Sequence, residues 1–225
     1  MSKEVEIIFL GVNDAGMRIY QWLCEQEDVF VHSILTTEEQ LQIVETIQPH
    51  YIISCGYSHI VPQEVLEIPS EGCLNLHPSY LPYNRGANPN VWSIVEDTPA
   101  GVTLHRMDES IDTGEILAQK RVEKQFSDTG KSLHQRLEDA QVELFKTAWP
   151  AVVADEISGE LQDQNTGTYA RTEDFENLCK LNPDETVRVK SFLDRLRALT
   201  FPPYNNARID VDGETYYITI DITKA

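Results

Sequence analysis

Short apolar runs alternate with amphipathic stretches along most of the chain. Runs of strand length, rich in Val and Ile, predict β-strands at Val5–Leu10, Val29–Leu35, Tyr51–Cys55, Cys73–His77, Val102–Arg106 and Ile116–Val122. Helical periodicity and cap signals predict helices at Ala15–Cys24, from the capping-box pair Thr37 and Gln40 to before Pro49, at Gln63–Leu66 and at Ser132–Trp149. Alternation of this kind indicates an α/β fold.

After the long helix the pattern changes. The stretch 163–172 is polar and loop-like. Asn182-Pro183 then predicts the start of a helix that runs to about Leu199, with proline at the favoured first position. We therefore expect a main domain at residues 1–160 and an appendage at residues 161–225.

The appendage ends in a hairpin signal. Asp212-Gly213 lies between two runs of strand character, Ala207–Val211 and Thr215–Ile220, and this dipeptide is typical of a tight turn between antiparallel strands. A lone hairpin is only marginally stable in water, so it is expected to pack on the main domain or on a second copy of the chain. We predict a homodimer formed through this tail.

The charge balance argues against some partners. The chain has 37 Asp and Glu against 18 Lys and Arg, a net charge of -19, which disfavours binding to tRNA or another nucleic acid. The same charge also fits a salt-rich cytoplasm. No apolar run approaches the roughly 20 residues that cross a bilayer, and the start is acidic where a signal peptide is basic. We expect a cytoplasmic protein without a membrane partner.

The four cysteines form no C-x-x-C pair, so neither a metal site nor a disulfide framework is expected. Candidate chemistry lies instead at Asn75-Leu76-His77, where a predicted strand ends. Residues two apart in a strand point to the same face, so an amide and an imidazole can converge there on one atom. A lone Asn-x-His more often marks an ordinary hydrogen bond beside a proline, and the neighbouring motifs decide the interpretation.

Two loops accompany this pair. The first runs His77-Pro78-Ser79-Tyr80-Leu81-Pro82 and continues to Arg85-Gly86, and the second is Asp108-Glu109-Ser110-Ile111-Asp112-Thr113-Gly114. Together they resemble the folate-dependent formyltransferases, most strongly from Tyr51 to about Leu144. The resemblance implies a Rossmann-like domain with a mostly parallel sheet flanked by helices. It also implies that Asn75, His77 and Asp112 are the catalytic residues of an enzyme.

In that family the formyl group comes from 10-formyltetrahydrofolate, and no metal takes part. Attack of an amine on a formyl carbon builds negative charge on oxygen and positive charge on nitrogen. An Asn N–H and a His can stabilise the oxyanion, and an Asp can help to remove the amine proton. The resemblance also implies that the loop 57–61 and the segment 108–112 surround the folate. The candidate residues are Tyr57, Ser58, His59, Ile60, Val61, Asp108 and Ile111. Main chain makes many of these contacts, so residue identity is weak evidence for them.

The acceptor is indicated by two further stretches. Residues 195–207, RLRALTFPPYNNA, and residues 85–90, RGANPN, look like parts of the sugar N-formyltransferases, so the expected acceptor is a nucleotide-linked amino-deoxysugar. Its candidate contacts are Arg85, Gly86, Arg197 and Tyr204, because Arg matches phosphate oxygens and Tyr offers a stacking face. Arg197 reads equally well as a helix-surface charge.

One departure from the family and three alternatives remain open. Only some 15 residues join the second strand to Tyr51, so one strand-helix unit of the family is expected to be absent. The alternatives are a hydrolase that releases formate from 10-formyltetrahydrofolate, a formyltransferase for another small amine, and a protein without catalysis. The last would be either a scaffold or regulatory homologue that keeps the trio but binds no acceptor, or a nucleotide-binding Rossmann module. The Rossmann module is weakly supported, because Gly11 and Gly16 lack the G-x-G-x-x-G spacing.

Overall fold

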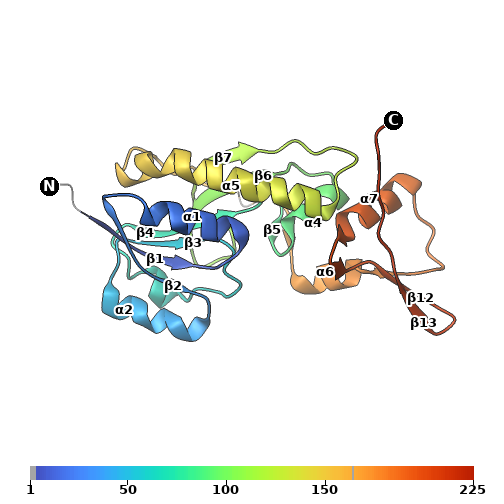
Figure 1. Cartoon of the computed structure of the whole chain (residues 1–225), viewed down its shortest axis with the longest axis horizontal. Coiled ribbons are helices and arrows are strands. Elements are labelled where there is room, and N and C mark those ends of the chain that lie inside the picture. The colour runs from blue at the N-terminus through green and yellow to red at the C-terminus, as the bar shows by residue number, and fades with distance from the viewer. Residues whose placement is uncertain (1–3, 164) are drawn as a thin grey trace.

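The computed structural model describes residues 4–163 and 165–225. A six-stranded sheet in the order β2-β1-β3-β4-β6-β7 forms its centre (Figure 1). The strands are β1 (Val5–Leu10), β2 (Val29–Leu35), β3 (Tyr51–Ser54), β4 (Gly72–His77), β6 (Gly101–Arg106) and β7 (Ile116–Arg121). The first four pair in parallel, whereas β6 pairs antiparallel with both β4 and β7. The expected α/β fold with a mostly parallel sheet is confirmed.

Both faces of this sheet are buried. In β1 the side chains of Ile7 and Phe9 join one apolar cluster and those of Ile8 and Leu10 join another, as alternation along a strand requires. Helices α1 (Asp14–Cys24) and α5 (Gly130–Val153) pack on the first face. The short helices η1 (Glu38–Gln42), α2 (Ile43–Ile47) and α3 (Gln63–Leu66) pack on the second. Figure 1 shows α1 and α5 on one side of the strands and α2 on the other.

The connection from β2 to β3 is short, as expected. It contains only η1 and α2, and the predicted capping box at Thr37 and Gln40 is present at its start. No further strand follows β2 in the described sheet, so β2 forms one edge. None of the helices in the described ranges is both long and apolar enough to span a membrane.

Three helices differ from the sequence prediction. Helix α5 runs past Pro150 to Val153, because near a helix end proline removes a single hydrogen bond, and the Ala154 N–H still donates to the Pro150 carbonyl. Helix α4 (Pro89–Val95) begins at the end of the RGANPN stretch and was not predicted. Helix α6 (Thr172–Leu178) follows the polar loop and was not predicted.

The predicted helix start at Asn182-Pro183 is wrong, because helix α7 spans Val189–Leu199. Asn182 instead closes a turn, where its side-chain oxygen accepts the Asp184 N–H at 3.1 Å and its carbonyl accepts the Glu185 N–H at 3.1 Å. Asn competes with helix formation through bonds of this kind. The prediction mistook this Asn-Pro turn for a helix start.

The predicted hairpin is confirmed. Strands β12 (Arg208–Val211) and β13 (Glu214–Tyr217) pair antiparallel around Asp212 and Gly213, both with positive φ, as a tight hairpin turn requires. A third strand, β9 (Lys180–Leu181), adds in parallel to β12. The pair β10 (Thr200–Phe201) and β11 (Tyr204–Asn205) lies between α7 and the hairpin in sequence. Figure 1 places α6, α7 and the hairpin together at the end of the molecule away from the N-terminus.

Candidate active site

The site forms where β4 ends beside β6. Their antiparallel pairing places Asn75 opposite His105 and His77 opposite Thr103. Directly opposed residues of an antiparallel pair share a face, so Asn75 and His105 meet. The Asn75 Nδ2 lies 3.2 Å from His105 Nε2.

Asp112 is the common partner of these side chains. It follows β6 in a loop, and its φ of +57° lies in the left-handed region that Asp tolerates better than most residues. Its Oδ2 accepts the Gly86 N–H at 2.9 Å and lies 3.4 Å from His77 Nδ1. Its Oδ1 accepts the Asn75 Nδ2 at 3.4 Å and lies 3.5 Å from His105 Nε2. One buried carboxylate therefore faces an amide, two imidazoles and a backbone N–H.

The carboxylate of Asp112 is ionised in this setting. Burial by itself raises the pKa of Asp112, because it penalises the charged form. The charge of His77, the bond and charge of His105 and the Gly86 N–H outweigh it, and hold the pKa of Asp112 well below its ordinary value. Asp112 thus carries a negative charge across the neutral range.

Each imidazole is fixed by one ring nitrogen. His77 Nε2 donates to the Asn84 carbonyl at 3.0 Å, and His105 Nδ1 donates to the Arg106 carbonyl at 2.8 Å. Carbonyl oxygens only accept, so these nitrogens carry protons. The other nitrogen of each ring, Nδ1 of His77 and Nε2 of His105, faces the Asp112 carboxylate. Both imidazole rings are therefore held with one nitrogen toward the carboxylate.

A buried glutamine, Gln162, links the segment that carries Arg85 to the loop that carries Asp112. The Gln162 amide group donates to the Asp112 carbonyl at 3.0 Å and to the Gly114 carbonyl at 2.8 Å. Its Oε1 accepts from Arg85 Nε at 3.2 Å and from Nη2 at 2.7 Å. Burial lowers the pKa of Arg85, against the opposing charge of Asp112. Arg85 is thus a structural neighbour of the site, with its guanidinium turned to Gln162.

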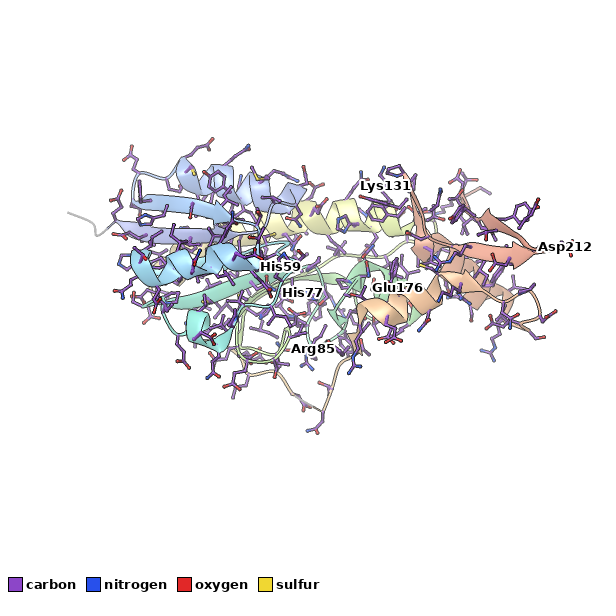
Figure 2. The ribbon with its side chains drawn as sticks, turned by 90° about the horizontal axis from the view of Figure 1, so that it is seen from below. His59, His77, Arg85, Lys131, Glu176 and Asp212 are labelled. Atoms are coloured by element: carbon purple, nitrogen blue, oxygen red, sulfur yellow. The ribbon has the colours of Figure 1, made fainter. Side chains whose placement is uncertain are left out.

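The polar cluster opens into a cavity of about 670 Å³, within the range of small-molecule sites. Beside Asn75, His77, His105 and Asp112, its lining comes from residues 57–61, 107–111, 86–87 and 169–173. Figure 2 labels His59 and His77 beside each other, with Arg85 nearby. Across residues 4–163 and 165–225, no group of three or more His, Cys, Asp or Glu is placed to hold a metal ion.

Most of the sequence-predicted residues meet at this cavity. Those that line it are Asn75, His77, Asp112, Tyr57, Ser58, His59, Ile60, Val61, Asp108, Ile111 and Gly86. Arg85, Arg197 and Tyr204 do not line it. The Arg197 guanidinium is buried in α7, where it donates to Asp194 Oδ1 at 2.8 Å and to the Asp128 carbonyl at 3.0 Å, so Arg197 is not a helix-surface charge either. Tyr204 is exposed on β11 beside Phe201. Nucleotide contacts of Arg197 and Tyr204 stay predictions that this cavity does not support.

Sequence reasoning missed His105, Gln162 and the wall formed by residues 169–173. His105 is a polar residue near the end of a predicted strand, the same signal that identified Asn75 and His77. Only the pairing of β4 with β6 brings His105 next to Asn75, and this pairing was not predicted from the sequence. Gln162 and residues 169–173 lie in a polar stretch with no recognisable pattern.

Comparison with known proteins gives two family matches. A model described as formyl transferase matches residues 15–149, and a model described as N-formyltransferase dimerization C-terminal domain matches residues 174–224. The chain is also similar to the GDP-perosamine N-formyltransferase of Brucella melitensis. The two are 33% identical over 199 residues, 87% of this chain and 74% of the relative.

Solved structures agree with these matches. A 4-N formyltransferase from Francisella tularensis superposes with a TM-score of 0.88 at 25% identity, covering 98% of this chain and 99% of that one. A formyltransferase from Anoxybacillus kamchatkensis, solved in complex with UDP-4,6-dideoxy-4-formamido-L-AltNAc and tetrahydrofolate, has a TM-score of 0.67 at 34% identity. It covers 76% of this chain and 88% of that chain.

Proposed function

The chain belongs to the formyl transferase family, and from this premise we propose that it transfers a formyl group from 10-formyltetrahydrofolate to the amino group of a nucleotide-linked amino-deoxysugar. The observation that carries the proposal is the convergence of Asn75, His77 and Asp112 on one cavity. The sugar acceptor is supported by the relatives, which are described as acting on GDP-perosamine or as 4-N formyltransferases.

Asn75 and His77 stabilise the oxyanion in the proposed mechanism. The Asn75 amide nitrogen lies 3.2 Å from His105 Nε2 and 3.4 Å from Asp112 Oδ1 at the cavity wall, and in the proposed mechanism it turns an N–H to the formyl oxygen. His77 lines the same cavity with its ring fixed by Asn84. A preorganised donor of this kind contributes about 3 to 4 kcal/mol of transition-state stabilisation.

Asp112 accepts the proton that the amine loses, directly or through a water molecule. Its lowered pKa keeps it ionised, and its contact with the Gly86 N–H fixes the direction of the carboxylate. The facing nitrogens of His77 and His105 lie within 3.5 Å of the same carboxylate and can relay that proton. This role adds His105 to the three catalytic residues expected from the sequence, Asn75, His77 and Asp112.

The donor fits the part of the cavity formed by residues 57–61, Asp108 and Ile111. Among the described residues, the backbone N–H and C=O groups of residues 57–61 have no backbone hydrogen-bond partner, so they are available to the polar edge of a pterin. Ile60 and Ile111 are 67% and 42% exposed beside the cavity and offer apolar contact to a ring. The bound donor supplies the formyl group, and these residues orient it toward Asn75.

We also propose that two copies of the chain associate through the tail. The tail matches a dimerization domain, and Val189, Phe192, Tyr216 and Tyr217 leave large apolar areas exposed on it. Exposed large apolar side chains on a segment that matches a dimerization domain fit a role in that interface. In this proposal residues 1–160 form the catalytic domain and residues 161–225 the appendage. The protein acts in the cytoplasm, and its acidic charge disfavours a nucleic-acid partner.

The test is an absorbance assay for tetrahydrofolate release from 10-formyltetrahydrofolate, run with a panel of GDP-, dTDP- and UDP-linked amino sugars. We expect turnover that requires an amino sugar and that falls at least about 100-fold in Asn75→Ala. Turnover without any amine, with release of formate, would instead identify a hydrolase. Turnover with a simple amine but with no nucleotide sugar would refute the proposed acceptor.

A further inference from the structure

One wall of the cavity comes from a segment that lies between the two matched family models. Tyr169, Ala170, Arg171, Thr172 and Glu173 all line the cavity, whereas the models cover residues 15–149 and 174–224. In Figure 2 the helix that follows this segment, α6, carries the Glu176 label and extends from the neighbourhood of Arg85. The catalytic cavity is therefore completed by residues to which neither family model assigns a function.

Backbone pairing fixes this wall against the catalytic loop. Strand β8 (Tyr169–Ala170) pairs in parallel with β5 (Arg85–Gly86). The Ala87 N–H donates to the Ala170 carbonyl at 2.9 Å, and the Arg85 N–H donates to the Thr168 carbonyl at 2.9 Å. A Cβ on residue 86 would collide with the Ala170 carbonyl and the Tyr169 ring, and φ there is +84°, so this close approach requires glycine.

This pairing sets the distance from the wall to the chemistry. The Gly86 N–H donates to the Asp112 carboxylate, and Gly86 pairs with Ala170, the residue before Arg171. Paired strands lie about 5 Å apart and consecutive Cα atoms about 3.8 Å, so the Arg171 Cα lies no more than about 9 Å from the Gly86 Cα. The Tyr169 ring lies against Gly86, whose N–H holds the Asp112 carboxylate.

The cavity has a marked charge pattern. Its acidic residues are Asp108, Glu109, Asp112 and Glu173. Among the described residues, Arg171 is the one Lys or Arg in the cavity lining. A nucleoside diphosphate sugar carries two negative charges on its diphosphate, and these need a cation in a cavity with so many carboxylates.

Arg171 is available for that task. Its side chain is exposed, and within residues 4–163 and 165–225 the arginine ion pairs are made by other arginines. His77 and His105 face Asp112, and His59 belongs to the loop assigned to the donor. The guanidinium of Arg171 can therefore make a two-pronged contact with phosphate oxygens.

We propose that Arg171 binds the diphosphate of the nucleotide-linked acceptor, and that the Tyr169 ring packs against the sugar between the diphosphate and Asp112. This inference rests on the proposed function and adds the residues that recognise its acceptor. In this inference Arg171 and Tyr169, which line the cavity, take the roles that the sequence analysis gave to Arg197 and Tyr204.

The experiment measures the binding of free GDP, dTDP, UDP and inorganic pyrophosphate by calorimetry to the wild type, Arg171→Ala and Arg171→Lys. The control is Arg188→Ala, an exposed arginine at the start of α7 outside the cavity. We expect Arg171→Ala to bind at least one nucleoside diphosphate about 10- to 100-fold more weakly, and Arg171→Lys to fall between it and the wild type. Tetrahydrofolate affinity is expected to stay unchanged in every variant.

Unchanged nucleoside diphosphate affinity in Arg171→Ala would overturn the inference, as would a wild type that binds none of these probes. A selective loss of tetrahydrofolate affinity would also overturn it, because the cation would then serve the carboxylates of the folate tail. A wild type that binds nucleoside diphosphates through Arg171 but formylates no amino sugar would leave the inference standing and refute the proposed reaction.

Discussion

Replacement of Gln162 by alanine tests whether the buried glutamine positions Asp112. The substitution removes four hydrogen bonds, two from Arg85 and two to the carbonyls of Asp112 and Gly114. It leaves the buried Arg85 guanidinium without its side-chain acceptor among the described residues. Each buried polar group left without a partner costs about 1 to 3 kcal/mol, and local relaxation recovers part of the sum. The expected loss in the free energy of unfolding is about 2 to 4 kcal/mol.

The activity is expected to fall for a separate reason. The Asp112 carbonyl is held by Gln162 while its carboxylate is held by Gly86, so loss of the first contact lets the loop move. A shift of about 1 Å in a catalytic group can cost roughly 100-fold in rate. Gln162→Glu keeps the acceptor for Arg85 but places oxygen against the two carbonyls. It is expected to lose activity even where it retains stability.

Two measurements separate the effects. Urea unfolding gives the free energy of unfolding, and tetrahydrofolate release gives kcat and KM. The matched control is Asn206→Ala, which removes an amide bond to the Leu199 carbonyl in the tail, 3.0 Å long, and is expected to lower stability with kcat unchanged. If Gln162→Ala and Gln162→Glu both keep kcat within twofold of the wild type, Gln162 does not position Asp112.

Three further outcomes are expected. Because the contacts of Asp112 hold its pKa below the ordinary value, the stability it contributes is present above about pH 4 and is lost as pH falls through the folded-state pKa. Its carboxyl-carbon NMR signal should show no titration between pH 5 and 8, and a midpoint in that range would contradict the cause assigned here. Burial raises the pKa of Cys55 and Cys73 to about 12, so in the native protein the exposed Cys24 should react first with a thiol reagent. Rapid reaction of the thiol reagent with the Cys24→Ser variant would contradict the expectation that Cys24 reacts first. Phe192→Asp puts a charge on the exposed apolar surface of the tail and should convert a dimer into monomers in light scattering, whereas an unchanged mass would locate the interface elsewhere.

Local patterns in the sequence determined much of the fold. The alternation in β1, with Ile7 and Phe9 on one face and Ile8 and Leu10 on the other, shows that both faces of the sheet are covered. The turn at Asp212-Gly213 and the capping box at Thr37 were equally readable, because each depends on residues within a few positions. The helix predicted at Asn182-Pro183 failed where a side chain had two local uses, a helix cap or a turn.

The candidate catalytic residues were also accessible from the sequence, because the motifs around Asn75 and Asp112 are long and ordered. The spatial arrangement of these residues was not accessible from the sequence. His105 became part of the site through the pairing of β4 with β6, and that register depends on the whole sheet. Arg197 is the reverse case, because the resemblance of residues 195–207 to the sugar N-formyltransferases suggested a ligand contact, whereas the fold commits its guanidinium to Asp194.

Tertiary structure alone decided the rest of the cavity. Gln162 reaches Asp112 across 50 positions and Arg85 across 77, and the wall at Arg171 depends on the pairing of β5 with β8. Contacts over such separations leave no period or spacing in the sequence, because they form only after the chain closes on itself. The sequence by itself determined the strands of the sheet, most of the helices that cover it and the motifs that carry the chemistry. Contacts between segments far apart in the sequence decided which polar groups hold the catalytic residues in place and which charged residue faces the acceptor.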